Sequence, residues 1–214
     1  MLGEYVAGEI AALPMPGQVK VLPSSGNATD YGQIGERLQP LRPSTTLGTV
    51  HSLRDALPVF ATVDVVVLGG GTAGAPAGIS AARQGAKTLV LEYLHGLGGM
   101  GTLGLIGKYW DGYREGFTVE IDKGVREMAP LDHPRQRKDW KESYNADWKM
   151  EWYRRELRKA GAEIWFGVLG CGALVEDNVV KGLVVATPEG RGVILANKVI
   201  DSTGSADIAI AAGA

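Results

Sequence analysis

Cysteine is almost absent from this 214-residue sequence, in which Cys171 is the only example. A single cysteine excludes an internal disulfide framework and a metal centre built on several thiolates. We expect Cys171 to pack as a small apolar side chain, since free cysteine is among the most buried residue types. Histidine is scarce as well, and His51, His95 and His133 are too scattered to suggest a metal site or a catalytic triad. No metal is therefore expected.

An excess of charge of either sign is also missing. The 22 basic and 24 acidic residues give a net charge of -2, so nothing indicates binding to nucleic acid or to an anionic membrane surface. No stretch reaches the roughly 18 apolar residues that a membrane span requires, and the N-terminus lacks the basic and apolar parts of a secretion signal. We expect a cytoplasmic protein whose ligand is a small molecule.

Proline is concentrated at one end of the chain. Six of the ten prolines fall within residues 1–60, which resist long helices and central strands. We interpret residues 1–60 as an extended N-terminal arm with one short strand at 18–22; a disordered leader is the alternative. Residues 61–214 form the expected domain.

The pattern changes at residues 63–68, a β-branched run typical of a parallel strand that is buried on both faces. Residues 72–84 are rich in small side chains and predict a helix, with Pro76 in its first turn and Gly85 at its C-terminal end. Residues 87–91 predict the next strand. Together these segments form one βαβ unit of about thirty residues.

Two further helices are expected at residues 117–129 and 138–160. Aromatic side chains recur every fourth residue along the second, which predicts one stripe that packs against a sheet or a partner; these are Trp140, Tyr144, Trp148 and Trp152. Short strands separated by turn residues then predict a β-meander; they span residues 162–168, 172–176, 179–187, 192–195 and 198–200.

The segment between the first strand and the first helix matches the dinucleotide-binding pattern G-x-G-x-x-G. Gly69 permits the tight turn, Gly71 lets the backbone approach a diphosphate, and Gly74 lets the helix lie close to the strand. Thr72 and Ala73 lie at the helix N-terminus, where unpaired N–H groups and a partial positive charge attract phosphate.

An acidic residue completes this pattern. Glu92 ends the second strand, 18 residues beyond Gly74, where a carboxylate can accept hydrogen bonds from both hydroxyls of an adenosine ribose. The same carboxylate would repel a 2′-phosphate, which disfavours NADP. A glycine-rich loop at residues 94–104 follows, whereas a nicotinamide-binding domain commonly continues with another βα unit.

Three blocks in this order resemble the large FAD-dependent oxidoreductase superfamily of glutathione-reductase-like fold. They are residues 69–92, residues 97–104 (LGGMGTLG) and residues 200–207 (IDSTGSAD), and the resemblance covers about residues 63–214. It implies an α/β, Rossmann-like, three-layer FAD-binding domain with a central parallel sheet, helices on one face and a β-meander on the other. The flavin would accept a hydride or an electron pair from a small organic substrate. No catalytic acid or base can be named.

The resemblance also implies roles for individual residues. Gly69, Gly71, Gly74 and Glu92 would hold the ADP portion of FAD. The remaining implied contacts are Gly98, Gly99 and Thr102 at the diphosphate and ribityl chain, Val168 at the adenine through its backbone, Thr203 and Gly204 near the phosphates, and Asp207 as a further polar contact.

Two segments near the flavin keep alternative interpretations. We interpret His95 as a loop residue near the ribose, with covalent attachment of FAD as the alternative. Residues 108–114, which include Arg114, either face the flavin ring or the substrate, or form a surface loop.

The third block is followed in the family by an alanine-rich helix, within which this sequence stops. We therefore expect the domain to be incomplete and to work with a complementary polypeptide that carries the substrate domain and the remaining FAD contacts. The N-terminal arm and the aromatic stripe are the surfaces that we expect it to cover. A cleaved precursor and a truncated chain are alternatives to a separate subunit. Two other functions stay open, an NAD-linked oxidoreductase and a non-catalytic FAD-binding subunit.

Overall fold

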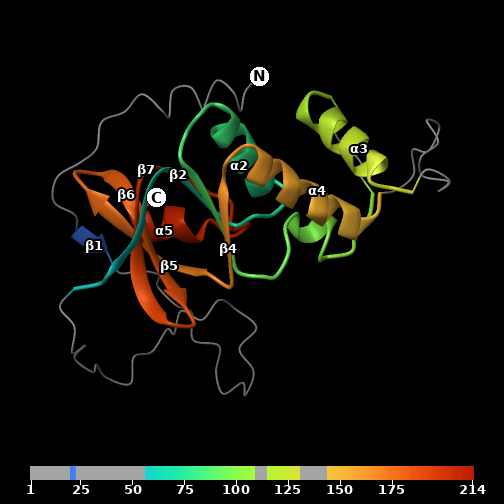
Figure 1. Cartoon of the computed structure of the whole chain (residues 1–214). Helices are drawn as coiled ribbons and strands as arrows, with labels where there is room; N and C mark the ends of the chain where they lie inside the picture. The colour runs from blue at the N-terminus through green and yellow to red at the C-terminus, as the bar shows by residue number, and fades with distance from the viewer. Residues whose placement is uncertain (1–19, 23–55, 109–114, 131–143) are drawn as a thin grey trace, which may run out of the picture.

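The computed structural model describes residues 20–22, 56–108, 115–130 and 144–214. Most of the expected N-terminal arm lies outside this part of the chain. The elements, drawn in Figure 1, are β1 (Lys20–Leu22), β2 (Val59–Leu68), α2 (Gly74–Arg83), β3 (Thr88–Glu92), the 3-10 turn η1 (Gly99–Gly101), α3 (Phe117–Glu127), α4 (Ala146–Lys159), β4 (Glu163–Phe166), β5 (Leu169–Glu176), β6 (Val179–Thr187), β7 (Gly190–Asp201) and α5 (Asp207–Ala212).

The strands form one mixed sheet in the order β1-β5-β6-β7-β2-β3-β4. Strands β7, β2, β3 and β4 are parallel neighbours, whereas β5, β6 and β7 form an antiparallel meander that β1 extends at its edge. Strand β7 therefore belongs to both parts: it pairs with β6 on one side and with β2 on the other.

Alternating side chains of β2 show how the layers are arranged. Val65 and Val67 pack in one core cluster with residues of α2, α3 and α4. Val66 and Leu68 pack in a second cluster with residues of the meander and of α5. All four are at most 4% exposed, as the β-branched run predicts for a strand covered on both faces. This arrangement confirms the expected three-layer α/β, Rossmann-like fold.

Helix α2 lies close to the sheet because its inward side chains are small. A Cβ added to Gly78 would be 2.5 Å from Cγ2 of Val90 on β3, so only glycine fits this contact without a shift. Pro76 is the third residue of the helix, where its missing N–H breaks no hydrogen bond of the first turn. Gly85 follows the C-cap residue with φ of +87°, as expected for a glycine that ends a helix.

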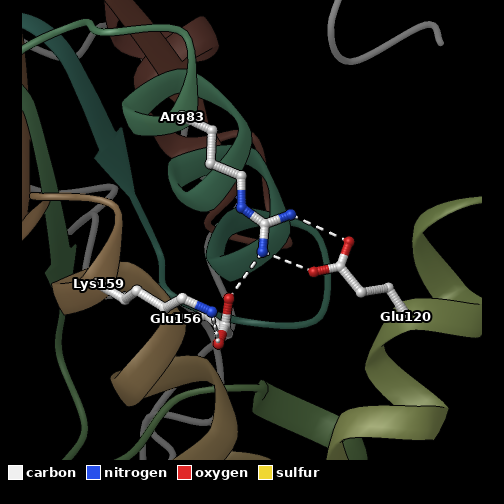
Figure 2. Close-up of polar contacts among 4 residues, drawn as sticks. All are labelled: Arg83, Glu120, Glu156 and Lys159. Carbon is white, nitrogen blue, oxygen red and sulfur yellow. Dashed lines mark hydrogen bonds and ion pairs between the residues drawn. The ribbon is translucent and has the colours of Figure 1, made fainter.

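An ion-pair network ties the three helices together at the surface (Figure 2). Both terminal nitrogens of Arg83 on α2 bind the carboxylate of Glu120 on α3, at 2.6 and 3.0 Å. Nη2 of Arg83 also binds Glu156 on α4 at 2.7 Å, and Lys159 lies 3.4 Å from the same carboxylate. The hydrogen bonds to Glu120 raise the pKa of Arg83; burial lowers it, and the hydrogen bond to Glu156 helps to outweigh burial, so the pKa of Arg83 stays above its ordinary value.

The second long helix begins later than expected. Asn145 is the N-cap of α4, with an extended backbone and a side chain that accepts a hydrogen bond from the N–H of Trp148 at 3.0 Å. Tyr144 therefore precedes the helix, so the expectation that it shares one helical stripe with Trp148 and Trp152 is wrong. Trp140 lies outside the described residues. Trp152 packs within the chain, 7% exposed and against Gly124 of α3, and is not a surface for a partner.

Two other expectations are corrected. The separate strands expected at 192–195 and 198–200 are one strand, β7, because it pairs with β2 along its length and Asn197 donates to Asp64 at 3.1 Å. Cys171 is exposed instead of buried, because the register of β5 and β6 shifts between Gly170 and Gly172 and no residue of β6 lies opposite Cys171 in the sheet.

The short strand expected at 18–22 is present as β1. No helix in the described ranges has both the length and the apolar character of a membrane span.

Candidate functional site

The residues singled out from the sequence gather at one edge of the sheet. The four parallel strands end there, β2 at Leu68, β3 at Glu92, β4 at Phe166 and β7 at Asp201. The chain passes from β2 to β3 and β4 on one side, whereas β7 lies on the other side of β2. The strand order therefore reverses at β2, and ligands of open α/β sheets bind in the crevice at such a point.

The first glycine loop is packed too tightly for any other residue at two positions. Gly69 has φ of +94°, and a Cβ there would be 2.3 Å from the carbonyl oxygen of Ser202. A Cβ on Gly74 would be 1.8 Å from the carbonyl oxygen of Gly69. These contacts bring the start of α2 against the end of β7. The roles expected for Gly69 and Gly74 in the tight turn and the close helix therefore agree with their surroundings.

The second glycine loop faces the first. The N–H of Gly98 donates to the carbonyl oxygen of Gly70 at 2.8 Å, and Oγ1 of Thr72 donates to the carbonyl oxygen of Gly98 at 2.9 Å. A Cβ added to Gly71 would come no closer to the protein than 3.9 Å, the distance to Cα of Gly99. Of the glycines in the motif, Gly71 is thus the one at which a Cβ would make only an ordinary van der Waals contact with the described residues.

Backbone N–H groups of both loops are left without acceptors. In the described part of the chain, no protein atom accepts from the N–H groups of Gly71, Thr72 and Ala73 on one loop or of Gly99 and Met100 on the other. The first three lie at the N-terminus of α2, where the helix dipole adds partial positive charge. Unused donors on two facing loops are the surroundings that a diphosphate requires, so the residues present fit this group.

Glu92 is held beside the first loop. Its side chain is nearly buried, with the residue 9% exposed, and Oε1 accepts a hydrogen bond from the N–H of Leu94 at 2.9 Å. Oε2 lies 3.4 Å from the position of a Gly70 Cβ, and no described residue donates a hydrogen bond to it. A fixed carboxylate with one oxygen still available fits the hydroxyl groups of a ribose.

The third loop is organised by Asp201. Its Oδ1 accepts from the hydroxyl and the N–H of Thr203 at 2.7 and 3.1 Å, and its Oδ2 accepts from the N–H groups of Ile208 and Ala209, both at 2.9 Å. Burial would raise the pKa of Asp201, but these hydrogen bonds outweigh it and hold the pKa below its ordinary value. Gly204 follows with φ of +83° and is exposed.

The side chain of Thr102 and the N–H of Val168 are already used inside the protein. Thr102 is 0% exposed and its hydroxyl donates to the carbonyl oxygen of Leu97 at 2.5 Å, so this side chain shapes the loop. The N–H of Val168 donates to the carbonyl oxygen of Glu92 at 3.2 Å, which leaves the carbonyl group of Val168 for a base.

The remaining candidates lie in different surroundings. His95 is exposed on the second loop, and Asp207 accepts a hydrogen bond from Ser205 at 2.8 Å at the start of α5. Arg114 lies outside the described residues.

Sequence reasoning missed two residues behind the second loop. Tyr144 donates its hydroxyl to the carbonyl oxygen of Ile106 at 2.8 Å, and its N–H donates to that of Gly107 at 2.7 Å. Lys149, on the first turn of α4, is 1% exposed and lies over the ring of Tyr144. The aromatic spacing assigned Tyr144 to the helix, and no pattern marked Lys149, since its position depends on the tertiary packing.

Solved structures share the fold, and two of them illustrate the likeness. THI4 from Thermovibrio ammonificans superposes with a TM-score of 0.54 at 22% sequence identity, over 70% of this chain and 61% of that one. A geranylgeranyl bacteriochlorophyll reductase-like protein from Thermoplasma acidophilum gives a TM-score of 0.53 at 23% identity, over 72% of this chain and 42% of the other. The chain thus spans less than two thirds of either structure. No curated protein sequence matches it.

A family model gives a more specific assignment. The model described as FAD dependent oxidoreductase matches residues 64–214, the part of the sequence that carries the three glycine-containing blocks. The match covers more than half of the chain and includes every element from β2 onward except the start of that strand. The chain therefore belongs to the FAD dependent oxidoreductase family, whose cofactor is FAD.

Proposed function

We propose that this chain supplies the ADP-binding half of a flavin-dependent oxidoreductase that acts on a small organic substrate. One observation carries the proposal: two facing glycine loops hold N–H groups that no described residue accepts from, and they lie beside a nearly buried carboxylate at the point where the strand order reverses. Each part of this arrangement matches one part of an ADP group, the diphosphate and the ribose.

Individual residues then have distinct tasks. Gly71, Thr72 and Ala73 donate to one phosphate from the helix N-terminus, and Gly99 donates from the facing loop. Glu92 accepts from the ribose hydroxyls. Gly69, Gly74, Gly98 and Thr102 shape the two loops, Val168 offers its carbonyl group to the adenine, and the turn at Thr203 and Gly204 borders the phosphates.

The flavin supplies the hydride or electron-pair chemistry, and this chain binds and orients it.

We further propose that a complementary polypeptide completes the site. Three apolar side chains are exposed at the second loop: Met100 within it is 64% exposed, and Leu105 and Ile106 directly after it are 81% and 41% exposed. Apolar side chains gathered beside a ligand site support an interface there. A cytoplasmic location stays a prediction from the sequence.

The cofactor released from the purified protein tests the proposed function. The native assembly should show a flavin absorbance spectrum, and denaturation should release a molecule with the mass of FAD. Release of a nicotinamide dinucleotide would support the NAD-linked alternative instead. Anaerobic titration with candidate substrates should bleach the flavin; a flavin that no class of organic donor or acceptor changes would favour a non-catalytic subunit.

Native mass measurement addresses the complementary polypeptide. We expect the active, FAD-containing species to hold a second chain. An active FAD complex that contains only these 214 residues would contradict this part of the proposal.

A further inference from the structure

The outer face of the β-meander carries apolar side chains that are almost fully buried. Leu174 on β5, Val184 on β6 and Val193 on β7 form a core cluster of their own and are 2%, 5% and 7% exposed. Among the described residues, the partly buried apolar side chains that pack against this cluster are those of Leu57 and Leu195. A buried side chain typically contacts about 6–12 other residues, so these two supply only part of the cover.

The inner face of the meander is already closed by described elements. Leu183 and Val185, the neighbours of Val184 on β6, lie on the opposite face because successive side chains of a strand alternate. They pack in the cluster that contains Ile208 and Ala211 of α5. A further segment of chain can therefore pack on the meander from its outer side.

Two described segments flank the meander, one at each edge. Strand β1 pairs with β5, where Val21 lies opposite Leu174, and β2 pairs with β7, where Val59 lies opposite Val193. In the sheet order, β1 and β2 are four strand spacings of about 4.8 Å apart, or at most roughly 19 Å. Residues 23–55 connect these two strands, and an extended chain could cross this distance with about six residues.

We propose that residues 23–55 cross the outer face of the meander and cover Leu174, Val184 and Val193. Leu57, which follows this segment closely, packs on the same cluster, so the chain reaches β2 from the outer side. The segment also offers seven large apolar or aromatic side chains for the contact, which are Tyr31, Ile34, Leu38, Leu41, Leu47, Val50 and Leu53.

The N-terminal arm is then a layer of its own domain and not a surface for the complementary polypeptide. This inference goes beyond the proposed function and does not depend on bound FAD.

Cross-linking of the full chain in its native assembly identifies the segment that covers this face. Leu195 is partly buried at the edge of the cluster, and Cys171 is the only native cysteine. Leu195→Cys combined with Cys171→Ser therefore gives one thiol for a short maleimide photo-cross-linker, and its cross-linked peptides should come from residues 23–55. Isotope-labelled chains mixed with unlabelled ones distinguish links within a chain from links between copies. Val119→Cys on α3, at a side chain that is 52% exposed, is the control and should give no link to this segment.

Two neighbouring valines give a second, energetic test. Val184→Thr should lower the folding equilibrium constant about tenfold, because its hydroxyl is buried under the arm without water. In a full-length chain whose seven apolar arm residues are replaced by serine, the same substitution should lower it less than about threefold. Val185→Thr is the matched control: Val185 is 0% exposed on the inner face, so its substitution should lower the constant by the same factor in both backgrounds.

The outcomes decide which segment covers the meander. Links to residues 23–55 of the same chain, with a cost of Val184→Thr that depends on the arm, would support the proposal. Links only to another copy would show exchange of arms between chains and overturn it, as would links only to a different polypeptide or no links at all. An equal cost of Val184→Thr in both backgrounds would overturn it as well. If the serine variant does not fold, the cross-linked peptides decide alone.

Discussion

Gly71→Ala should separate cofactor binding from folding. The added methyl group would come no closer to the described protein than 3.9 Å, an ordinary contact, and Gly71 is not among the glycines with positive φ. The apoprotein should therefore keep its stability or gain about 0.4–1 kcal/mol from the lower entropy of the unfolded chain. The methyl group would, however, enter the space that the diphosphate needs. Loss of two charge-assisted hydrogen bonds between the diphosphate and the loop N–H groups would weaken FAD binding by about 3 kcal/mol, or roughly a hundredfold in Kd.

Thermal unfolding of the apoprotein and titration with FAD measure these two effects separately. Gly74→Ala is the control with the opposite expectation, because its Cβ would be 1.8 Å from the carbonyl oxygen of Gly69. That variant should lose more than about 3 kcal/mol of stability through backbone displacement alone. A Gly71→Ala protein that binds FAD as tightly as wild type would show that the diphosphate lies elsewhere.

Three further predictions address the carboxylates and the surface network. Glu92→Ala should weaken FAD binding by about 1.5–3 kcal/mol, measured by titration, since a hydrogen bond to a charged group is lost; unchanged affinity would remove Glu92 from the site. Asp201 has a lowered pKa in the folded chain, so its stabilising effect is present above its unfolded pKa and is lost as the pH falls through the folded value. Asp201→Asn should therefore lower stability most near neutral pH, and a difference from wild type that grows in acid would contradict this reasoning. Arg83→Met should lower the free energy of unfolding by about 1 kcal/mol in low salt and less in high salt, as followed by denaturant titration, because its partners are surface carboxylates.

The sequence predicted the parts of the site that depend on local geometry. The spacing of Gly69, Gly71 and Gly74 is set by one turn between a strand and a helix, and Glu92 is placed by the length of the next helix and strand. These constraints act over short stretches of chain, so a single sequence displays them. The β-branched run of β2 likewise revealed a strand covered on both faces.

Other features depend on contacts between distant segments and gave weaker signals. Asn145 is a favourable N-cap residue, but the regular aromatic spacing on both sides of it favoured a longer helix. The position of Lys149 behind Gly101 arises only when the loops are packed. The exposure of Cys171 follows from a bulge that composition does not reveal.

The contact between Gly69 and Ser202 has a consequence for the order of folding. These residues belong to loops that follow β2 and β7, and the pairing of those strands joins positions as far apart as Asp64 and Asn197, 133 residues along the chain. Such distant pairings form slowly, because a long loop must close before any contact stabilises it. The first glycine loop reaches the packed geometry described above only when Ser202, at the end of β7, lies against Gly69. FAD binding is therefore expected to be a late event that reports the completed sheet, and a newly synthesised chain should acquire its cofactor only after β7 has emerged.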